Sequence, residues 1–257
     1  MNAAPGEVCG VCAAPLRVGA RFCGRCGAGR GRMIPRELGV GAIEEEPRAR
    51  APAALDGRGL VVALGVYFAL LVPTLVVLAR PAMPTPGTLL AIHLVAGVVG
   101  IAGLAALGRA GLAVLVPRRW RLADAAIAVA ATAAVLGAVQ GLERAVPWLF
   151  LELDLLLVDE RWSRATMLLH VALIPAVTEE LAFRGAILTG LRGLLSDRSA
   201  IAASAAVFAV AHLSVASIPH LTVLGVVFGW ARVRTGSIWP CVALHAAFNV
   251  ATVLLSF

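Results

Sequence analysis

The sequence predicts an all-α protein, a polytopic helical membrane bundle of about seven spans that follows a small cysteine-rich module. Of the 257 residues, 60% are hydrophobic and only 14% are charged. The mean hydropathy of +0.90 lies well above that of soluble domains. The charged residues fall mostly between apolar runs, and most of these runs approach the 20 or so residues that a helix needs to cross a bilayer.

The first thirty residues carry two C-x-x-C motifs with ten residues between them. Each motif presents two thiolates on a tight turn, and four thiolates complete a tetrahedral zinc site. Two disulfides are the alternative, which a reducing cytoplasm disfavours. We therefore expect residues 1–30 to form a zinc ribbon with a structural zinc ion on Cys9, Cys12, Cys23 and Cys26. Such a module can bind a protein partner, which the sequence does not identify.

Residues 31–58 are rich in Pro, Arg and Ala and include three consecutive glutamates, a composition typical of a solvated, disordered linker. We expect the transmembrane bundle to occupy residues 59–257. Its apolar runs cover residues 60–79, 88–108, 122–142, 165–188, 199–216, 220–233 and 238–256.

The arginines predict the orientation of the bundle. They gather before the first span and in alternate loops, at residues 109–121, 192–198 and 232–234. By the positive-inside rule the N-terminus and the ribbon are cytoplasmic, and the protein is a multi-pass protein of the inner or plasma membrane of the cell. The same rule accounts for the net charge of +7, so the bilayer is the expected partner and nucleic acid is not.

Two adjacent carboxyls and a guanidinium lie inside the apolar run at 165–188, where each charge costs about 2.5–3.5 kcal/mol to insert. Glu180 and Arg184 are four residues apart, so they share a helix face and can pair. Glu179 points about 100° away from Glu180 around the helix axis, so the same arginine does not obviously neutralise it. A buried ion pair that only fixes helix packing is the alternative to a reactive site.

Polar residues of later spans share the depth of these glutamates. At 1.5 Å per residue, Glu179 lies about 12–16 Å from the cytoplasmic end of its span, His212 about 20 Å, and His245 and Asn249 about 10 and 16 Å. Three separate spans thus place polar residues in one slab near the middle of the membrane. The other histidines, His93, His170 and His220, are expected to be packing residues.

This set of residues suits hydrolysis. A Glu and a His can activate a water molecule between them, and His245 with Asn249 can donate hydrogen bonds to an oxyanion. Two His and a carboxylate, here Glu179, His212 and His245, could also hold a zinc ion with an open position, and the sequence leaves both mechanisms open. Pro175 lacks an N–H, so it should kink the helix just before the glutamates.

The ordered motifs Glu-Glu-x-x-x-Arg, Phe-x-x-x-His and His-x-x-x-Asn resemble those of the CPBP family, over about residues 120–256. This family includes the type II CAAX prenyl proteases and bacterial relatives linked to bacteriocin self-immunity. The resemblance implies a helical membrane bundle that hydrolyses peptide bonds within the membrane. It implies that Glu179 and His212 activate water, that His245 and Asn249 shape the oxyanion site, and that Glu180 and Arg184 support them. The family is described both as metalloproteases and as glutamate-dependent proteases.

We therefore expect an intramembrane endopeptidase that acts on a membrane-associated peptide or protein substrate. A non-hydrolytic scaffold or bacteriocin-immunity protein of the same fold is the first alternative. A transporter is the second, because intramembrane carboxyls and histidines also form proton relays. Against a transporter, the intramembrane carboxyls and the motif histidines sit in the second half of the chain, without an inverted repeat.

Overall fold

The computed structural model describes residues 8–9, 33–34, 57–79, 85–149 and 162–255. Contacts divide the chain into two units, Met1–Ala51 and Pro52–Phe257.

In the first unit, the strands β1 (Val8–Cys9) and β2 (Met33–Ile34) pair in antiparallel orientation. Only the backbone of Cys9 is described, and three of the four expected zinc ligands, Cys12, Cys23 and Cys26, lie outside the described residues. The zinc ribbon therefore stays a prediction.

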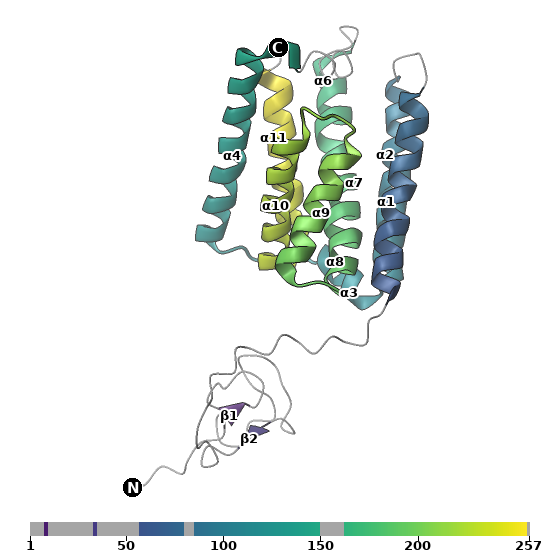
Figure 1. Ribbon diagram of the computed structural model, residues 1–257, viewed down its shortest axis with the longest axis vertical. Coiled ribbons are helices and arrows are strands. Elements are labelled where there is room, and N and C mark those ends of the chain that lie inside the picture. The colour runs from purple at the N-terminus through teal and green to yellow at the C-terminus, as the bar shows by residue number, and fades with distance from the viewer. Residues whose placement is uncertain (1–7, 10–32, 35–56, 80–84, 150–161, 256–257) are drawn as a thin grey trace. The chain divides into compact units, whose positions relative to one another are not determined.

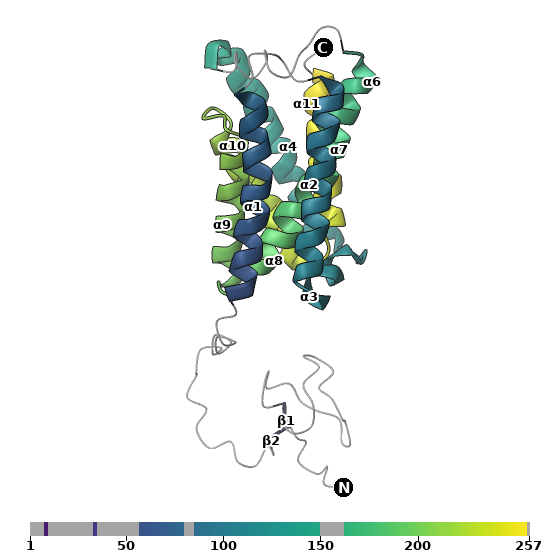
Figure 2. The same cartoon turned by 90° about the vertical axis from the view of Figure 1, so that its right-hand side faces the viewer.

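The second unit is a bundle of helices that run nearly along one direction (Figures 1 and 2). Its first part contains α1 (Gly57–Leu78), α2 (Pro86–Ala106), α3 (Arg109–Leu112), the 3₁₀ turn Ala113–Leu115, α4 (Leu122–Ala145) and the 3₁₀ turn Pro147–Leu149. A continuous helix of five pieces follows, here named the central helix: α6 (Arg164–Met167), the π-helix Leu168–Leu173, α7 (Ile174–Glu180), the π-helix Leu181–Ile187 and α8 (Leu188–Leu191). The last part contains α9 (Asp197–Ala211), α10 (Ile218–Thr235) and α11 (Trp239–Leu255).

Four helices are long and apolar enough to cross a bilayer, as expected of a membrane protein: Gly57–Val77, Pro86–Ala106, Leu122–Ala145 and Arg164–Leu191. The other three apolar runs of the sequence also form helices, α9, α10 and α11, of 15, 18 and 17 residues. The helical bundle is thus confirmed, and the count of about seven spans stays a prediction.

The central helix lies in the interior of the bundle. Half of its apolar part is buried (50%), against 11–22% for the other three candidate spans. Helices α1, α2, α9 and α11 all pack against it, and α10 packs on α9, α4 and α11. Residues of the central helix are therefore held by neighbours on several sides.

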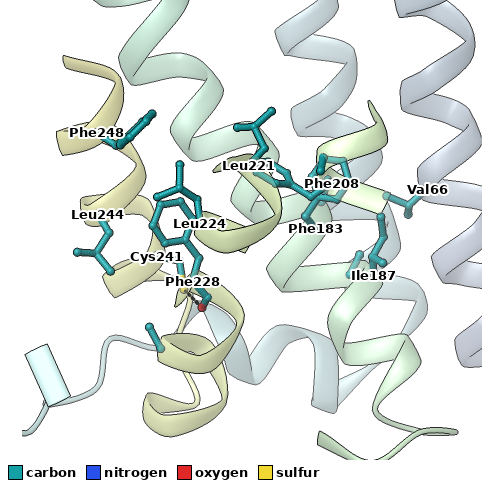
Figure 3. Packing of buried hydrophobic residues seen from close by; sticks show 14 of the residues in the cluster. Val66, Phe183, Ile187, Phe208, Leu221, Leu224, Phe228, Cys241, Leu244 and Phe248 are labelled. Atoms are coloured by element: carbon teal, nitrogen blue, oxygen red, sulfur yellow. Dashed lines mark hydrogen bonds between the residues drawn. The ribbon is translucent and has the colours of Figure 1, made fainter. Parts of the chain in front are cut away.

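Aromatic side chains fill the core between the central helix, α9 and α10 (Figure 3). The rings of Phe183 and Phe208 meet edge to face with centroids 5.1 Å apart, which is a favourable arrangement for an aromatic pair. Helix α10 approaches α9 so closely at Gly225 that a Cβ there would lie 2.8 Å from Ala205. This close contact fixes α9 against α10, which also packs on α11, and so it helps to position the polar residues of both neighbours.

Candidate active site

The two glutamates end α7, between the two π-helices of the central helix. A π-helical turn is rare and occurs often at functional sites. The first one precedes Pro175, which has no N–H to give to the carbonyl of Val171 at α spacing or of His170 at π spacing. Both carbonyls receive a side-chain donor from another helix instead. His93 Nε2 of α2 lies 2.9 Å from the His170 oxygen, and Asn249 Nδ2 of α11 lies 3.3 Å from the Val171 oxygen.

Glu180 and Arg184 form the ion pair that their spacing predicts. Arg184 Nη1 lies 2.9 Å from Glu180 Oε1, and both side chains are 0% exposed. His245 Nδ1 lies 2.9 Å from the same oxygen. The guanidinium stacks between two rings, 4.1 Å from the centroid of Phe208 and 5.3 Å from that of Phe228. Charge and aromatic faces offset part of the cost of burying this pair, because Glu180 Oε2 and Arg184 Nε and Nη2 have no hydrogen-bond partner among the described residues.

Glu179 faces the other way and meets two histidines. Its Oε2 lies 3.8 Å from Nε2 of His212 and 3.9 Å from Nε2 of His245. The side chains of Glu179 and His212 are 25% and 31% exposed, whereas His245 is nearly buried at 6%. The structure therefore brings together, from three helices, the residues that the sequence places at one depth.

The hydrogen bonds of the two imidazoles define what they present to Glu179. His212 Nδ1 lies 2.9 Å from the Phe208 carbonyl oxygen, which can only accept, so Nδ1 carries the proton. In His245 the same atom faces the carboxylate of Glu180 and donates to it. Neutral imidazoles held in this way both present an Nε2 lone pair beside Oε2 of Glu179. Three acceptors at this spacing suit a bridging water molecule or a cation.

The donor set fits zinc in kind, because two imidazoles with Nδ1 held by a carbonyl and a carboxylate are usual for zinc-binding histidines. In the described part of the chain, however, no group of three or more His, Cys, Asp or Glu side chains is close enough to hold a metal ion.

The backbone after His212 is unusual. Helix α9 ends at Ala211, with His212 as its C-cap, and Leu213 follows with a φ of 55°. Among the described residues it is the only non-glycine residue with a positive φ, a conformation that costs a branched side chain about 1–2 kcal/mol. This turn ends the helix directly at His212 and leaves the imidazole at the helix end.

Two contacts of the site add to the arrangement expected from the sequence. Asn249, which is expected to donate to an oxyanion together with His245, donates one N–H to the Val171 carbonyl, and its amide has a second N–H available. His93, expected to be a packing residue, donates to the His170 carbonyl in the turn before the glutamates, a partner that the sequence does not identify. Pro175 was the available signal, because the carbonyls that a proline frees inside a bundle need donors from elsewhere.

Residues 161–251 match the family model described as type II CAAX prenyl endopeptidase Rce1-like. This segment contains the glutamates, both histidines and Asn249, while α1, α2 and α4 lie outside it. The match supports the resemblance to the CPBP family in this part of the chain. Comparisons with curated proteins and with solved structures gave no match.

Proposed function

We propose that the chain is an intramembrane endopeptidase that hydrolyses peptide bonds of membrane-associated substrates. One observation carries the proposal: Glu179 Oε2 lies 3.8 and 3.9 Å from the Nε2 atoms of His212 and His245 and has no hydrogen-bond partner among the described residues, beside the Glu180–Arg184 ion pair. The match to an endopeptidase family over these same residues supports it.

In the proposed reaction, Glu179 and His212 hold a water molecule between them. The water oxygen attacks the peptide carbonyl carbon while Glu179 takes its proton, and Glu179 then passes that proton to the leaving amine. Glu179 is suited to this role because it lacks a partner on its own helix, whereas Glu180 is held by Arg184. The reaction consumes one water molecule and the peptide, and it needs no further reactant.

The oxyanion formed by this attack needs donors. In its protonated form His245 donates from Nε2, and the Glu180 carboxylate, 2.9 Å from Nδ1, offsets the charge of the ring. Asn249 has one N–H on Val171 and offers the other. Arg184 and Glu180 act as supports that fix the orientation of His245.

A cleavage assay tests the proposal. Purified wild type and Glu179→Ala would be incubated with a library of membrane peptides, and products identified by mass spectrometry. Wild type should give defined products that Glu179→Ala does not. Val177→Ala, a change two residues away at an exposed position of the same helix, is the matched control and should cleave like wild type. If wild type gives no products from such a library, the non-hydrolytic scaffold or immunity protein becomes the better hypothesis.

Zinc remains part of the proposal in two distinct places, the ribbon and the membrane site. Metal analysis of the full chain should find about one zinc ion, which a Cys12→Ser, Cys26→Ser variant loses because two of four thiolates are gone. Glu179→Gln should keep that ion if zinc is only structural. A second zinc ion in wild type that Glu179→Gln lacks would instead favour the metalloprotease mechanism.

A further inference from the structure

Arg232 is a buried arginine without an acidic partner. It lies in the last turn of α10 and is only 4% exposed. Two acidic residues at the starts of α4 and α9, Asp124 and Asp197, pair with Arg234 and Arg192 instead. Among the described residues, no carboxylate forms an ion pair with Arg232. Because a guanidinium keeps its charge in proteins, this one is buried without a counter-charge, which is costly.

The groups around this guanidinium do not supply the missing negative charge. Its Nη2 lies 3.4 Å from Thr189 Oγ1, a long hydrogen bond, and its Nε has no partner in the described part of the chain. The arginines whose charges act on Arg232, Arg192 and Arg118, add to the positive charge. The C-terminal end of α10 carries only a partial negative charge, so it offsets a fraction of this surplus. The surroundings of Arg232 therefore favour a bound anion.

A hollow of about 200 Å³ lies against the same threonine. Thr189, Arg58 and three glycines, Gly59, Gly190 and Gly193, are among the residues that line it. A Cβ on Gly59 would lie 2.6 Å from the carbonyl oxygen of Gly190, so α1 and α8 meet backbone to backbone beside the hollow. Its volume is below the roughly 300–1,000 Å³ of pockets for drug-sized ligands, so the hollow suits a small group.

Thr189 connects the hollow with Arg232. Its Oγ1 accepts from Arg232, and because a hydroxyl is both acceptor and donor, its own O–H can donate to a group in the hollow. Thr189 lies two residues before Leu191, where the central helix ends, which is about 3 Å along the helix axis. Figures 1 and 2 show α3, α8 and the start of α1 at this same end of the bundle. The hollow is therefore at the level of the lipid headgroups, where phosphate groups are abundant.

We infer that the hollow at Thr189 is an anion site for a phosphate group. The Thr189 hydroxyl donates to a phosphate oxygen, Arg58 lines the hollow, and Arg232 attracts the anion from behind Thr189. Guanidinium groups and hydroxyls are usual partners of phosphate, whose several oxygens accept hydrogen bonds from different directions. The site is separate from Glu179, which lies ten residues away, about 15 Å along the central helix. Two sources carry such a group, the headgroup of an anionic lipid and free inorganic phosphate.

Thermal unfolding of the full-length protein in a maltoside detergent, which contains no phosphate, tests the inference. Phosphatidylglycerol, inorganic phosphate, or chloride at equal ionic strength would be added. Near saturation, a bound phosphate group should raise the unfolding temperature by about 5–10 °C above the chloride sample. A rise with phosphatidylglycerol alone identifies a lipid headgroup, and a rise with inorganic phosphate shows that the free ion suffices. If neither raises the unfolding temperature of the wild type, the inference is overturned.

Two variants and a matched control locate the effect. Arg232→Met removes the buried charge, so without phosphate it should unfold at the wild-type temperature or above, and it should lose the rise with ligand. Arg234→Met removes an equal charge from the same helix outside the hollow and should keep the rise. Thr189→Val keeps the side-chain shape without the hydroxyl and should lose most of the rise, which decides the matter if Arg232→Met does not fold. A rise in Arg232→Met or Thr189→Val as large as in Arg234→Met would show general charge attraction and overturn the inference.

Discussion

The two halves of the bundle on either side of the glutamates are built differently. In the half that follows the glutamates along the central helix, here named the closed half, the fully buried Glu180–Arg184 pair lies against the rings of Phe208 and Phe228. In the half that precedes the glutamates along the central helix, Pro175 leaves backbone carbonyls without an N–H donor, and His93 and Asn249 of other helices donate to them. The comparison shows that the two adjacent glutamates, Glu179 and Glu180, have different surroundings and therefore different roles. Glu180 is held by Arg184 and His245 and supports the structure, whereas Glu179 has no ion pair on its own helix and meets the two histidines through Oε2.

The largest expected effect comes from the residues that meet Glu179. His212→Ala should lower the cleavage rate by about 10²–10⁴-fold, because His212 shares the reacting water with Glu179. Thermal unfolding should change little, since His212 is partly exposed at a helix end. Combined with Glu179→Gln, the loss should be little larger than that of either change alone, because the two residues act on one water molecule. A double variant whose loss is the product of the two single losses would show that they act separately.

Substitutions in the closed half should lower the free energy of unfolding. Arg184→Ala leaves the carboxylate of Glu180 buried without its ion-pair partner, which typically costs about 3–5 kcal/mol in the free energy of unfolding. Arg192→Ala, at the end of the same helix, removes an exposed pair with Asp197 and should cost about 1 kcal/mol or less. Unfolding in detergent measures both. Equal losses for the two variants would mean that the Glu180–Arg184 pair contributes no more than a surface contact.

A smaller effect is expected where α2 holds the proline turn. His93→Leu leaves the His170 carbonyl without its donor, and an unpaired buried carbonyl costs about 1–3 kcal/mol in the free energy of unfolding. His93→Gln keeps an N–H donor and should recover part of that loss. If His93→Leu unfolds like wild type, the hydrogen bond to His170 does not hold this half of the bundle.

Much of the site follows from spacing along helices. Residues four apart share a face, so the Glu180–Arg184 pair could be predicted, and residues at equal depth in separate spans meet, as Glu179 and His212 do. The rotation of each helix could not be predicted in the same way. The two π-helices shift the phase of the central helix, so that His245 reaches both glutamates and Asn249 reaches Val171. The spacing of residues in the sequence gives no sign of that shift.

The most direct test of the account compares two identical changes at adjacent positions, Glu179→Gln and Glu180→Gln, by cleavage rate and by unfolding in detergent. Glu179→Gln should cleave about 10²–10⁴-fold more slowly and unfold like wild type, because the amide keeps the shape and cannot accept the proton. Glu180→Gln should lower the free energy of unfolding by about 3–5 kcal/mol, because it leaves the Arg184 charge buried without a counter-charge. A Glu179→Gln variant that cleaves at the wild-type rate would contradict the assignment of Glu179 as the base.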